Sequence, residues 1–164
     1  MAASQRSFKY CPRCATELRT TPIDGRERPT CACGFVAFDN PTPVVAALVE
    51  SPEGVVLVRG HAWPPGWFGL VTGFIECNEL PTGAVLREVR EELGVDAELQ
   101  GLIGHYIFEA KNELIIAYHV RITVPVQLGE ELEASRTVPV SELKPWGFGT
   151  GLAVADWLRA RVRG

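Results

Sequence analysis

Three glutamates fall within one turn of a predicted helix, and their spacing points to metal chemistry. Glu88, Glu91 and Glu92 stand at positions i, i+3 and i+4, so a helix brings their carboxylates to one face. Like charges at i,i+4 cost about 0.2–0.5 kcal/mol even on a solvated surface. Mg²⁺ offsets such repulsion, because it takes oxygen ligands and is bound by carboxylates together with substrate phosphates. The spacing predicts a divalent metal site; the alternative is a solvated acidic helix face.

The residues around these glutamates favour the metal site. The helix predicted over 84–93 carries an apolar stripe at helical spacing, made of Val85, Leu86, Val89 and Leu93. Gly94 follows in the position of a helix-ending glycine. Arg87 can pair with Glu91 one turn further on, or with Glu79 before the helix. One guanidinium cannot neutralise three carboxylates, so the predicted face still requires a cation.

The segment Gly73–Val95 reads GFIECNELPTGAVLREVREELGV and resembles the signature of the Nudix hydrolases at every defined position. The resemblance implies an α/β fold, the Nudix-type α/β/α sandwich with a mixed sheet. It also implies hydrolysis of a nucleoside diphosphate linked to another moiety, with ADP-ribose-like compounds and dinucleotides as candidate substrates. Such hydrolysis needs in-line attack by a positioned water, which bound divalent ions assist.

The same resemblance assigns roles to individual residues. It implies that Glu88, Glu91 and Glu92 bind Mg²⁺ or Mn²⁺. Either of the first two would also accept the proton of the attacking water, and Arg87 with Glu79 would orient the glutamates.

The turn before the helix has an implied role as well. Gly73 would let this turn be tight. The carbonyl of Thr72 or of Gly73 would then face the metal ion.

The entry to the helix departs from the family pattern, in which Ser or Thr often precedes the proline as an N-cap. Leu80 precedes Pro81 here and cannot cap, so Thr82 or Glu79 is expected to take that role. Pro81 still suits the first helical turn. Gly83 weakens that turn by up to about 1 kcal/mol relative to Ala. These changes affect how the helix begins and leave the predicted metal face intact.

Four of the five cysteines lie near the N-terminus in two close pairs, Cys11 with Cys14 and Cys31 with Cys33. This pattern predicts a zinc ribbon whose four thiolates hold a structural Zn²⁺. The second pair is C-x-C where the usual spacing is C-x-x-C, so a three-ligand or vacant site and a disulfide are the alternatives. The remaining Cys77 has acidic neighbours and is interpreted as incidental.

Composition describes an ordinary soluble chain of 164 residues, with 46% apolar and 22% charged residues. No apolar run reaches 18 residues and the N-terminus lacks an apolar core, so we expect neither a membrane span nor a secretory signal. A cytoplasmic location is the default. Residues 1–39 hold six Lys/Arg and four Asp/Glu; the net charge of −4 leaves −6 for the remainder. Such an acidic body argues against binding of duplex nucleic acid.

Proline punctuation at 38–43 predicts a boundary between a zinc-ribbon-like segment at 1–39 and a Nudix hydrolase domain at 40–164. In the second part we expect strands at 44–50, 55–59, 69–76, 95–108, 114–124 and, at an edge, 133–138. A closing helix is expected at 150–162. Helices flanking such a sheet form an α/β/α sandwich.

Substrate contacts are harder to predict, because aromatic side chains are more often core residues than clamps for a base. Trp63 and Trp67 are candidates because they lie in a loop before the metal turn, and Phe108 is another aromatic candidate. Many family members use a further carboxylate from a downstream loop. Glu109 and Glu113 are the candidates for it here, followed by Glu130, Glu131 and Glu133.

Other functions remain as alternatives. NADH pyrophosphatases join a zinc ribbon to this fold but carry an S-Q-P-W-P-F-P-type motif, and residues 104–110 read GHYIFEA, which disfavours NADH. A catalytically weak nucleotide-sensing module is a second alternative. It would not need all the glutamates of the Nudix signature, so their presence disfavours it. An isomerase of isoprenoid diphosphates would need a protonating residue in an apolar pocket, and none stands out. Whether the chain forms a homodimer stays open.

Overall fold

The computed structural model describes residues 8–163, which fall into two compact units. One unit comprises the described residues up to Pro41 together with Glu109–Asn112, and the other comprises Thr42–Phe108 and Glu113 onward. The short helix η1 (Glu109–Lys111) belongs to the first unit. The Asn112 side chain holds it there by donating hydrogen bonds to the carbonyl and carboxylate oxygens of Asp39, at 3.3 and 3.2 Å.

The first unit is built around a β-hairpin. Strand β1 (Arg19–Ile23) pairs antiparallel with β2 (Arg26–Thr30). The turn residues Asp24 and Gly25 have φ values of 50° and 75°, as the tight turns that match strand twist require. One cysteine pair precedes β1 and the other follows β2, so hairpin formation brings both pairs to the same end.

The second unit is organised around a mixed sheet of six strands. Its order is β6 (Glu98–Phe108), β7 (Glu113–Arg121), β3 (Thr42–Ser51), β4 (Gly54–Gly60) and β8 (Leu132–Val138), while β5 (Val71–Phe74) also pairs with β3. The β3–β7 pairing is parallel and the other pairings are antiparallel. The mixed sheet and the expected edge strand are therefore confirmed.

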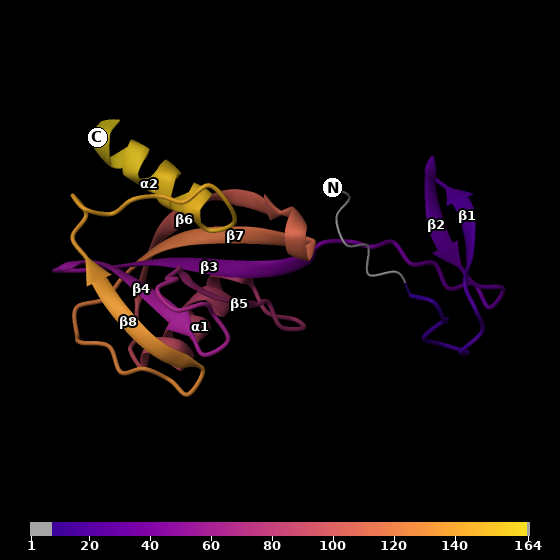
Figure 1. The fold of residues 1–164 in the computed structure, drawn as a ribbon, viewed down its shortest axis with the longest axis horizontal. Coiled ribbons are helices and arrows are strands. Elements are labelled where there is room, and N and C mark those ends of the chain that lie inside the picture. Colours follow the sequence, from indigo (N-terminus) through magenta and orange to yellow (C-terminus); the bar gives the residue numbers. More distant parts are fainter. Residues whose placement is uncertain (1–7, 164) are drawn as a thin grey trace. The chain divides into compact units, whose positions relative to one another are not determined.

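Two helices cover opposite faces of this sheet, α1 (Pro81–Leu93) on one side and α2 (Gly151–Arg163) on the other (Figure 1). Alternate β3 residues point to the two layers. The α1 layer buries Val45, Ala47, Val49, Val85, Val89 and Leu93. The α2 layer buries Ala46, Leu48, Ile115, Ala117, Val154 and Trp157. The predicted α/β/α sandwich is thus confirmed, and the apolar stripe of the first helix faces the core.

Strand β3 pairs with β4 and with β5 over different residues. It pairs with β4 only over Val49–Ser51 and with β5 over Val44–Ala47. An isolated bridge between Val58 and Gly69 links β4 to the residues before β5. Residues of both β4 and β5 line the site described below.

Several boundaries differ from those expected from the sequence. The strand expected at 114–124 ends at Arg121, because its partner residue Glu50 is almost the last of β3. The strand expected at 69–76 shortens to β5, whose pairing stops at Phe74 opposite Val44. The helix expected from residue 84 begins already at Pro81. Within residues 8–163, no helix combines the length and apolarity that a membrane span requires.

Candidate metal and active site

Arg87 is the centre of the polar network on α1. Its Nε and Nη2 donate to the two carboxylate oxygens of Glu79, at 2.8 and 2.9 Å. Its Nη1 donates to Glu88 Oε1 at 2.7 Å and to Glu91 Oε2 at 2.9 Å. Nη2 also reaches the Phe74 carbonyl oxygen at 3.0 Å. One planar guanidinium therefore links the helix to β5 and to the turn before the helix.

The turn before α1 is fixed by the same contacts. Hydrogen bonds from Arg87 and from the backbone N–H of Glu76 lower the pKa of Glu79 to about 2. Glu79 is thus engaged as an acceptor, and the structure contains no side-chain cap at the helix start. The expectation that Thr82 or Glu79 caps the helix is wrong. Leu80 occupies the N-cap position with an extended backbone, and Pro81 begins the helix without an N–H to satisfy.

Glu88 lies against the backbone of β5 at Gly73. A Cβ atom on Gly73 would overlap the Glu88 carboxyl group, so only glycine leaves room for this carboxylate. Burial raises the pKa of Glu88, while Arg87 opposes the rise. The strand and the helix therefore approach closely at the point where this carboxylate lies.

Glu92 is the most deeply placed of the three glutamates, with 9% of its surface exposed. Its Oε2 atom has no hydrogen-bond partner among the residues that the structure describes. Burial, followed by the charges of Glu88, Glu131 and Glu91, raises the pKa of Glu92 to about 8. A buried carboxylate without a partner is costly, and this one is oriented toward an open cavity.

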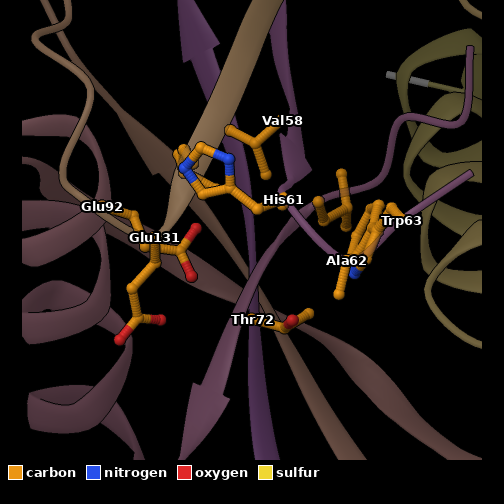
Figure 2. Close-up of a pocket in the computed structure, with 10 residues that line it drawn as sticks. Val58, His61, Ala62, Trp63, Thr72, Glu92 and Glu131 are labelled. Atoms are coloured by element: carbon orange, nitrogen blue, oxygen red, sulfur yellow. The ribbon is translucent and has the colours of Figure 1, made fainter. Parts of the chain in front are cut away.

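That cavity has a volume of about 440 Å³ and is lined on one wall by Glu92 and Glu131 (Figure 2). Thr72, His61 and Trp63 line it as well. The Trp63 ring lies against Gly69, where an added Cβ would come within 3.0 Å of it. Thr72 and Trp63, two of the predicted contact residues, therefore share one cavity with the carboxylates.

Glu131 is brought to this wall by the loop that precedes β8. The backbone N–H groups of Gln127 and Gly129 donate to the carbonyl oxygens of Leu93 and Glu92, at 2.7 and 2.8 Å. These bonds satisfy carbonyls that the end of a helix leaves free. They also hold Glu131 beside α1. No spacing in the sequence distinguished Glu131 from its neighbours Glu130 and Glu133, because the arrangement depends on backbone contacts of the loop.

A divalent cation fits this arrangement. The donor set consists of carboxylate oxygens, which are the ligands that Mg²⁺ and Mn²⁺ take. Glu92 supplies an unpartnered oxygen, and Gly73 makes room for Glu88. Arg87 restrains Glu88 and Glu91 without reaching Glu92. Negative charge therefore remains in excess where the cavity begins.

Comparison with known proteins bears on this arrangement. The sequence profile of the NUDIX domain matches residues 40–156, which is more than half of the chain. This chain belongs to the Nudix hydrolase family.

Curated relatives of this Nudix chain include the NAD-capped RNA hydrolase NudC of Pseudomonas aeruginosa. It is 26% identical over 144 residues, which cover 85% of this chain and 51% of that protein. The protein of the same name from Deinococcus radiodurans is 34% identical over 96 residues, covering 56% of this chain and 34% of that one. The chain spans about half the length, or less, of these relatives.

Solved structures share the fold. A Nudix hydrolase from Nitrosomonas europaea superposes with a TM-score of 0.81 at 23% identity, covering 96% of this chain and 94% of that chain. An ADP-ribose pyrophosphatase from Streptococcus suis gives a TM-score of 0.60 at 22% identity, covering 74% of this chain and 92% of that chain. At these identities the likeness establishes the architecture alone.

The other two aromatic candidates of this Nudix chain lie apart from the lining of the carboxylate cavity. The centroids of the Trp67 and Phe148 rings are 5.8 Å apart, and Phe148 stacks with Phe108 at a centroid distance of 6.2 Å. Trp67 and Phe148 are half-exposed. The two predicted aromatics thus meet through a third ring.

Of the two leading candidates for a downstream carboxylate, Glu113 lies on the opposite face of the sheet from the glutamate wall. Glu113 is buried at the start of β7. It precedes Ile115 by two residues and therefore points to the α2 layer, opposite α1. Glu109 lies in η1, which belongs to the first unit. The sequence-based preference for Glu113 over Glu131 did not anticipate this position, because alternation along β7 decides which face a side chain takes.

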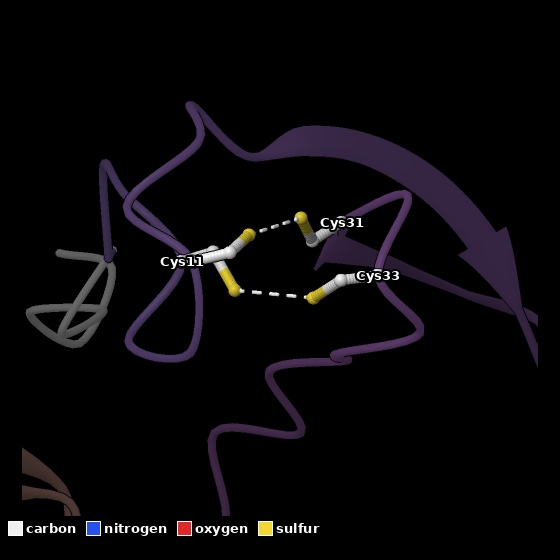
Figure 3. A group of neighbouring side chains, drawn as sticks. Cys11, Cys31 and Cys33 are labelled. Atoms are coloured by element: carbon white, nitrogen blue, oxygen red, sulfur yellow. Dashed lines mark hydrogen bonds between the residues drawn. The ribbon is translucent and has the colours of Figure 1, made fainter.

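The four N-terminal cysteines of the Nudix chain form one cluster (Figure 3). Their sulfur atoms all lie within 4.8 Å of one another. The Sγ atoms of Cys11 and Cys33 are 3.6 Å apart, and those of Cys14 and Cys31 are 3.5 Å apart. Tetrahedral zinc with Zn–S bonds of about 2.3 Å places its sulfurs about 3.8 Å apart. Zn²⁺ therefore fits this cluster, and the C-x-C spacing still presents both thiols. Cys77 is exposed, with a free thiol.

Proposed function

We propose that this Nudix protein is a Mg²⁺- or Mn²⁺-dependent pyrophosphohydrolase that cleaves the diphosphate of a nucleoside diphosphate linked to another moiety. The observation that carries the proposal is Glu92, a buried carboxylate with an unpartnered oxygen that lines an open cavity beside Glu88 and Glu131. A merely solvated acidic face would not bury such a group.

Each residue of the site has a distinct role in the proposed reaction. Glu88, Glu91 and Glu92 would hold the cation, with the Thr72 backbone and Glu131 at the same cavity. A cation bound there would offset the charge of the diphosphate and lower the pKa of the attacking water. Glu88 or Glu91 accepts the water proton. Arg87 positions the glutamates through its contacts with Glu79, Glu88 and Glu91.

The cavity and the relatives support the proposed substrate class. A volume of about 440 Å³ accommodates part of a nucleotide, and the Trp63 ring offers a surface for stacking. The curated relatives are named for the hydrolysis of NAD-capped RNA. Dinucleotide diphosphates of the NAD type therefore join ADP-ribose-like compounds as candidates. Residues 104–110, which end β6 and enter η1, lack the motif of the NADH pyrophosphatases, so free NADH is the less favoured member.

We further propose that residues 1–39 form a structural zinc ribbon and residues 40–164 the catalytic domain. Four thiolates around Zn²⁺ leave no open position for catalysis, so the ribbon would contribute folding of its own segment.

The test is a screen of nucleoside diphosphate derivatives with Mg²⁺ and Mn²⁺, with products identified by mass. We expect two phosphate-containing products from at least one compound, and near-complete loss of turnover in Glu92→Gln and Glu88→Gln. Glu53→Gln removes one carboxylate from an exposed turn and is the matched control. Full activity in both site variants would overturn the assignment. Binding without turnover across the panel would favour a nucleotide-sensing module.

A further inference from the structure

A second cavity of about 350 Å³ lies on the α2 face of strands β4 and β8, and it shares no lining residue with the carboxylate cavity. Its buried base includes Leu57 and Leu143. Phe68 and Trp146 form aromatic walls, and the exposed residues at its edge are Arg136, Glu142 and Lys144. Small-molecule sites have volumes of about 300–1,000 Å³ and an apolar lining with few polar groups. This cavity meets both criteria.

The two cations at this cavity are free to take a ligand. Among residues 8–163 neither Arg136 nor Lys144 forms a salt bridge, although Glu142 lines the same cavity. These cations lie in an acidic part of the chain, since residues 40–164 carry a formal charge of −6. Counting Glu142, the cavity edge carries a net charge of +1. It therefore favours an anion, whereas the carboxylate cavity repels one in the absence of metal.

The cavity also presents flat surfaces. The Arg136 guanidinium lies over the Phe68 ring, 4.3 Å from its centroid. Arg136 is paired directly with Leu57 across β4 and β8, which fixes the face from which its side chain emerges. The Trp146 ring lies so close to Gly151, at the start of α2, that a Cβ there would overlap it. An aromatic wall and a guanidinium plane are thus held in place before any ligand arrives.

We propose that this second cavity binds a nucleoside monophosphate unit, independently of the metal site. The base stacks on the Arg136 plane and on Trp146, as bases do on aromatic rings and guanidinium groups. The phosphate lies at Lys144, with Arg136 providing the second positive charge. The unit could come from a free nucleotide or from a single-stranded oligonucleotide, since both present the same base and phosphate.

The test is calorimetric titration of the full-length protein with AMP and, separately, with a short single-stranded oligoribonucleotide, in buffer without divalent cations. We expect saturable binding that weakens at least about tenfold in the double variant Arg136→Gln/Lys144→Gln, which removes both charge-assisted contacts. Arg90→Gln/Arg26→Gln removes two exposed charges elsewhere and is expected to bind as the wild type does. Adenosine and inorganic phosphate, each half of the ligand, are expected to bind more weakly than AMP.

The outcomes separate the sources and the two proposals. Binding of AMP identifies a free nucleotide as sufficient, whereas binding of the oligonucleotide alone identifies a unit within a strand. Glu88→Gln/Glu92→Gln is expected to keep this binding while losing turnover, so failure of the hydrolase proposal would leave it untouched. Absence of binding by both probes, or wild-type affinity in a folded Arg136→Gln/Lys144→Gln protein, would overturn the second site.

Discussion

Arg87 and Glu92 lie on the same helix and have contrasting roles. Arg87 donates to three glutamates and so fixes their geometry. Glu92 lies beyond its reach and keeps an oxygen unpartnered. A protein selected only for stability would replace such a carboxylate, since burial without a partner is unfavourable. The arrangement is therefore expected to cost stability where it provides metal affinity.

This cost in stability predicts that Glu92→Gln has opposite effects on stability and on turnover. Glu92→Gln removes a charge that burial and three neighbouring carboxylates disfavour. At pH 8 and without divalent metal, we expect the variant to unfold at a temperature higher by at least about 2 °C, as a gain of about 1 kcal/mol gives for this chain length. With Mg²⁺ its turnover should be nearly abolished. A thermal unfolding scan and an activity assay check the pair, and a lower unfolding temperature in metal-free buffer would contradict it.

Two glycines in the elements that form the site have different structural roles. Gly73 on β5 leaves room for the Glu88 carboxyl group, while Gly83 in the first turn of α1 has nothing nearer than 3.9 Å to an added Cβ. Both positions are near the site, yet only the first is required by its geometry. The two glycines therefore provide a matched pair for mutation.

Gly73→Ala is expected to displace Glu88 and to lower turnover by at least about 100-fold, the scale at which a misplaced metal ligand acts. Gly83→Ala is expected to leave turnover unchanged and to stabilise the protein by up to about 1 kcal/mol, because alanine favours the helix. Steady-state kinetics and denaturant unfolding measure the two effects. Equal activity in both variants would show that Glu88 does not depend on the close approach of β5.

A buried acid, Glu50, links α2 to the sheet in addition to the apolar packing. Its carboxylate accepts hydrogen bonds from His119 Nε2 at 2.8 Å and from Arg161 Nη1 at 2.6 Å. Burial alone would raise the pKa of Glu50, but these partners lower it overall. The Arg161 guanidinium also lies over the Trp157 ring, 4.7 Å from its centroid. The cluster joins β3, β7 and α2.

This cluster predicts a pH dependence of stability. Burial lowers the pKa of His119 below its ordinary value of 6.5, so the unfolded chain takes up the proton more readily than the folded protein. Stability from this group is therefore complete above pH 6.5 and decreases as the pH falls below it. His119→Gln cannot titrate and should flatten the decrease measured by denaturant unfolding between pH 7 and 5. An unchanged slope in His119→Gln would contradict the assignment.

At the scale of the whole molecule, the sequence predicted the sandwich, the edge strand and the four-cysteine cluster, since these depend on periodicity and spacing. It also placed Glu88, Glu91 and Glu92 on one helix face. It did not predict that Glu131 shares the wall, because a loop backbone bonded to the end of α1 decides that. It did not predict that Glu113 points to the α2 layer, because the register of β7 decides which face of the sheet each side chain takes. Local sequence patterns were therefore sufficient to predict the helix, whereas the rest of the site depends on tertiary contacts.

The ribbon provides a test of how the two units depend on metal. Removing Zn²⁺ with a chelator is expected to unfold the hairpin segment, since few apolar side chains are buried among its described residues, while the cores on both faces of the sheet persist. Hydrogen exchange resolves the two segments. Cys33→Ser should lower the zinc content of the purified protein and Cys77→Ser should not. Undiminished zinc in Cys33→Ser would indicate a site with three protein ligands.

Binding of Mn²⁺, followed by electron paramagnetic resonance, tests the metal role of the α1 carboxylates most directly. The ion is titrated into the wild-type protein, Glu88→Gln/Glu92→Gln and the exposed control Glu53→Gln. We predict saturable binding in the wild type and the control, and at least about a tenfold loss of affinity in the double variant, which lacks two of the proposed ligands. Equal Mn²⁺ affinity in all three proteins would show that Glu88 and Glu92 do not hold the metal ion.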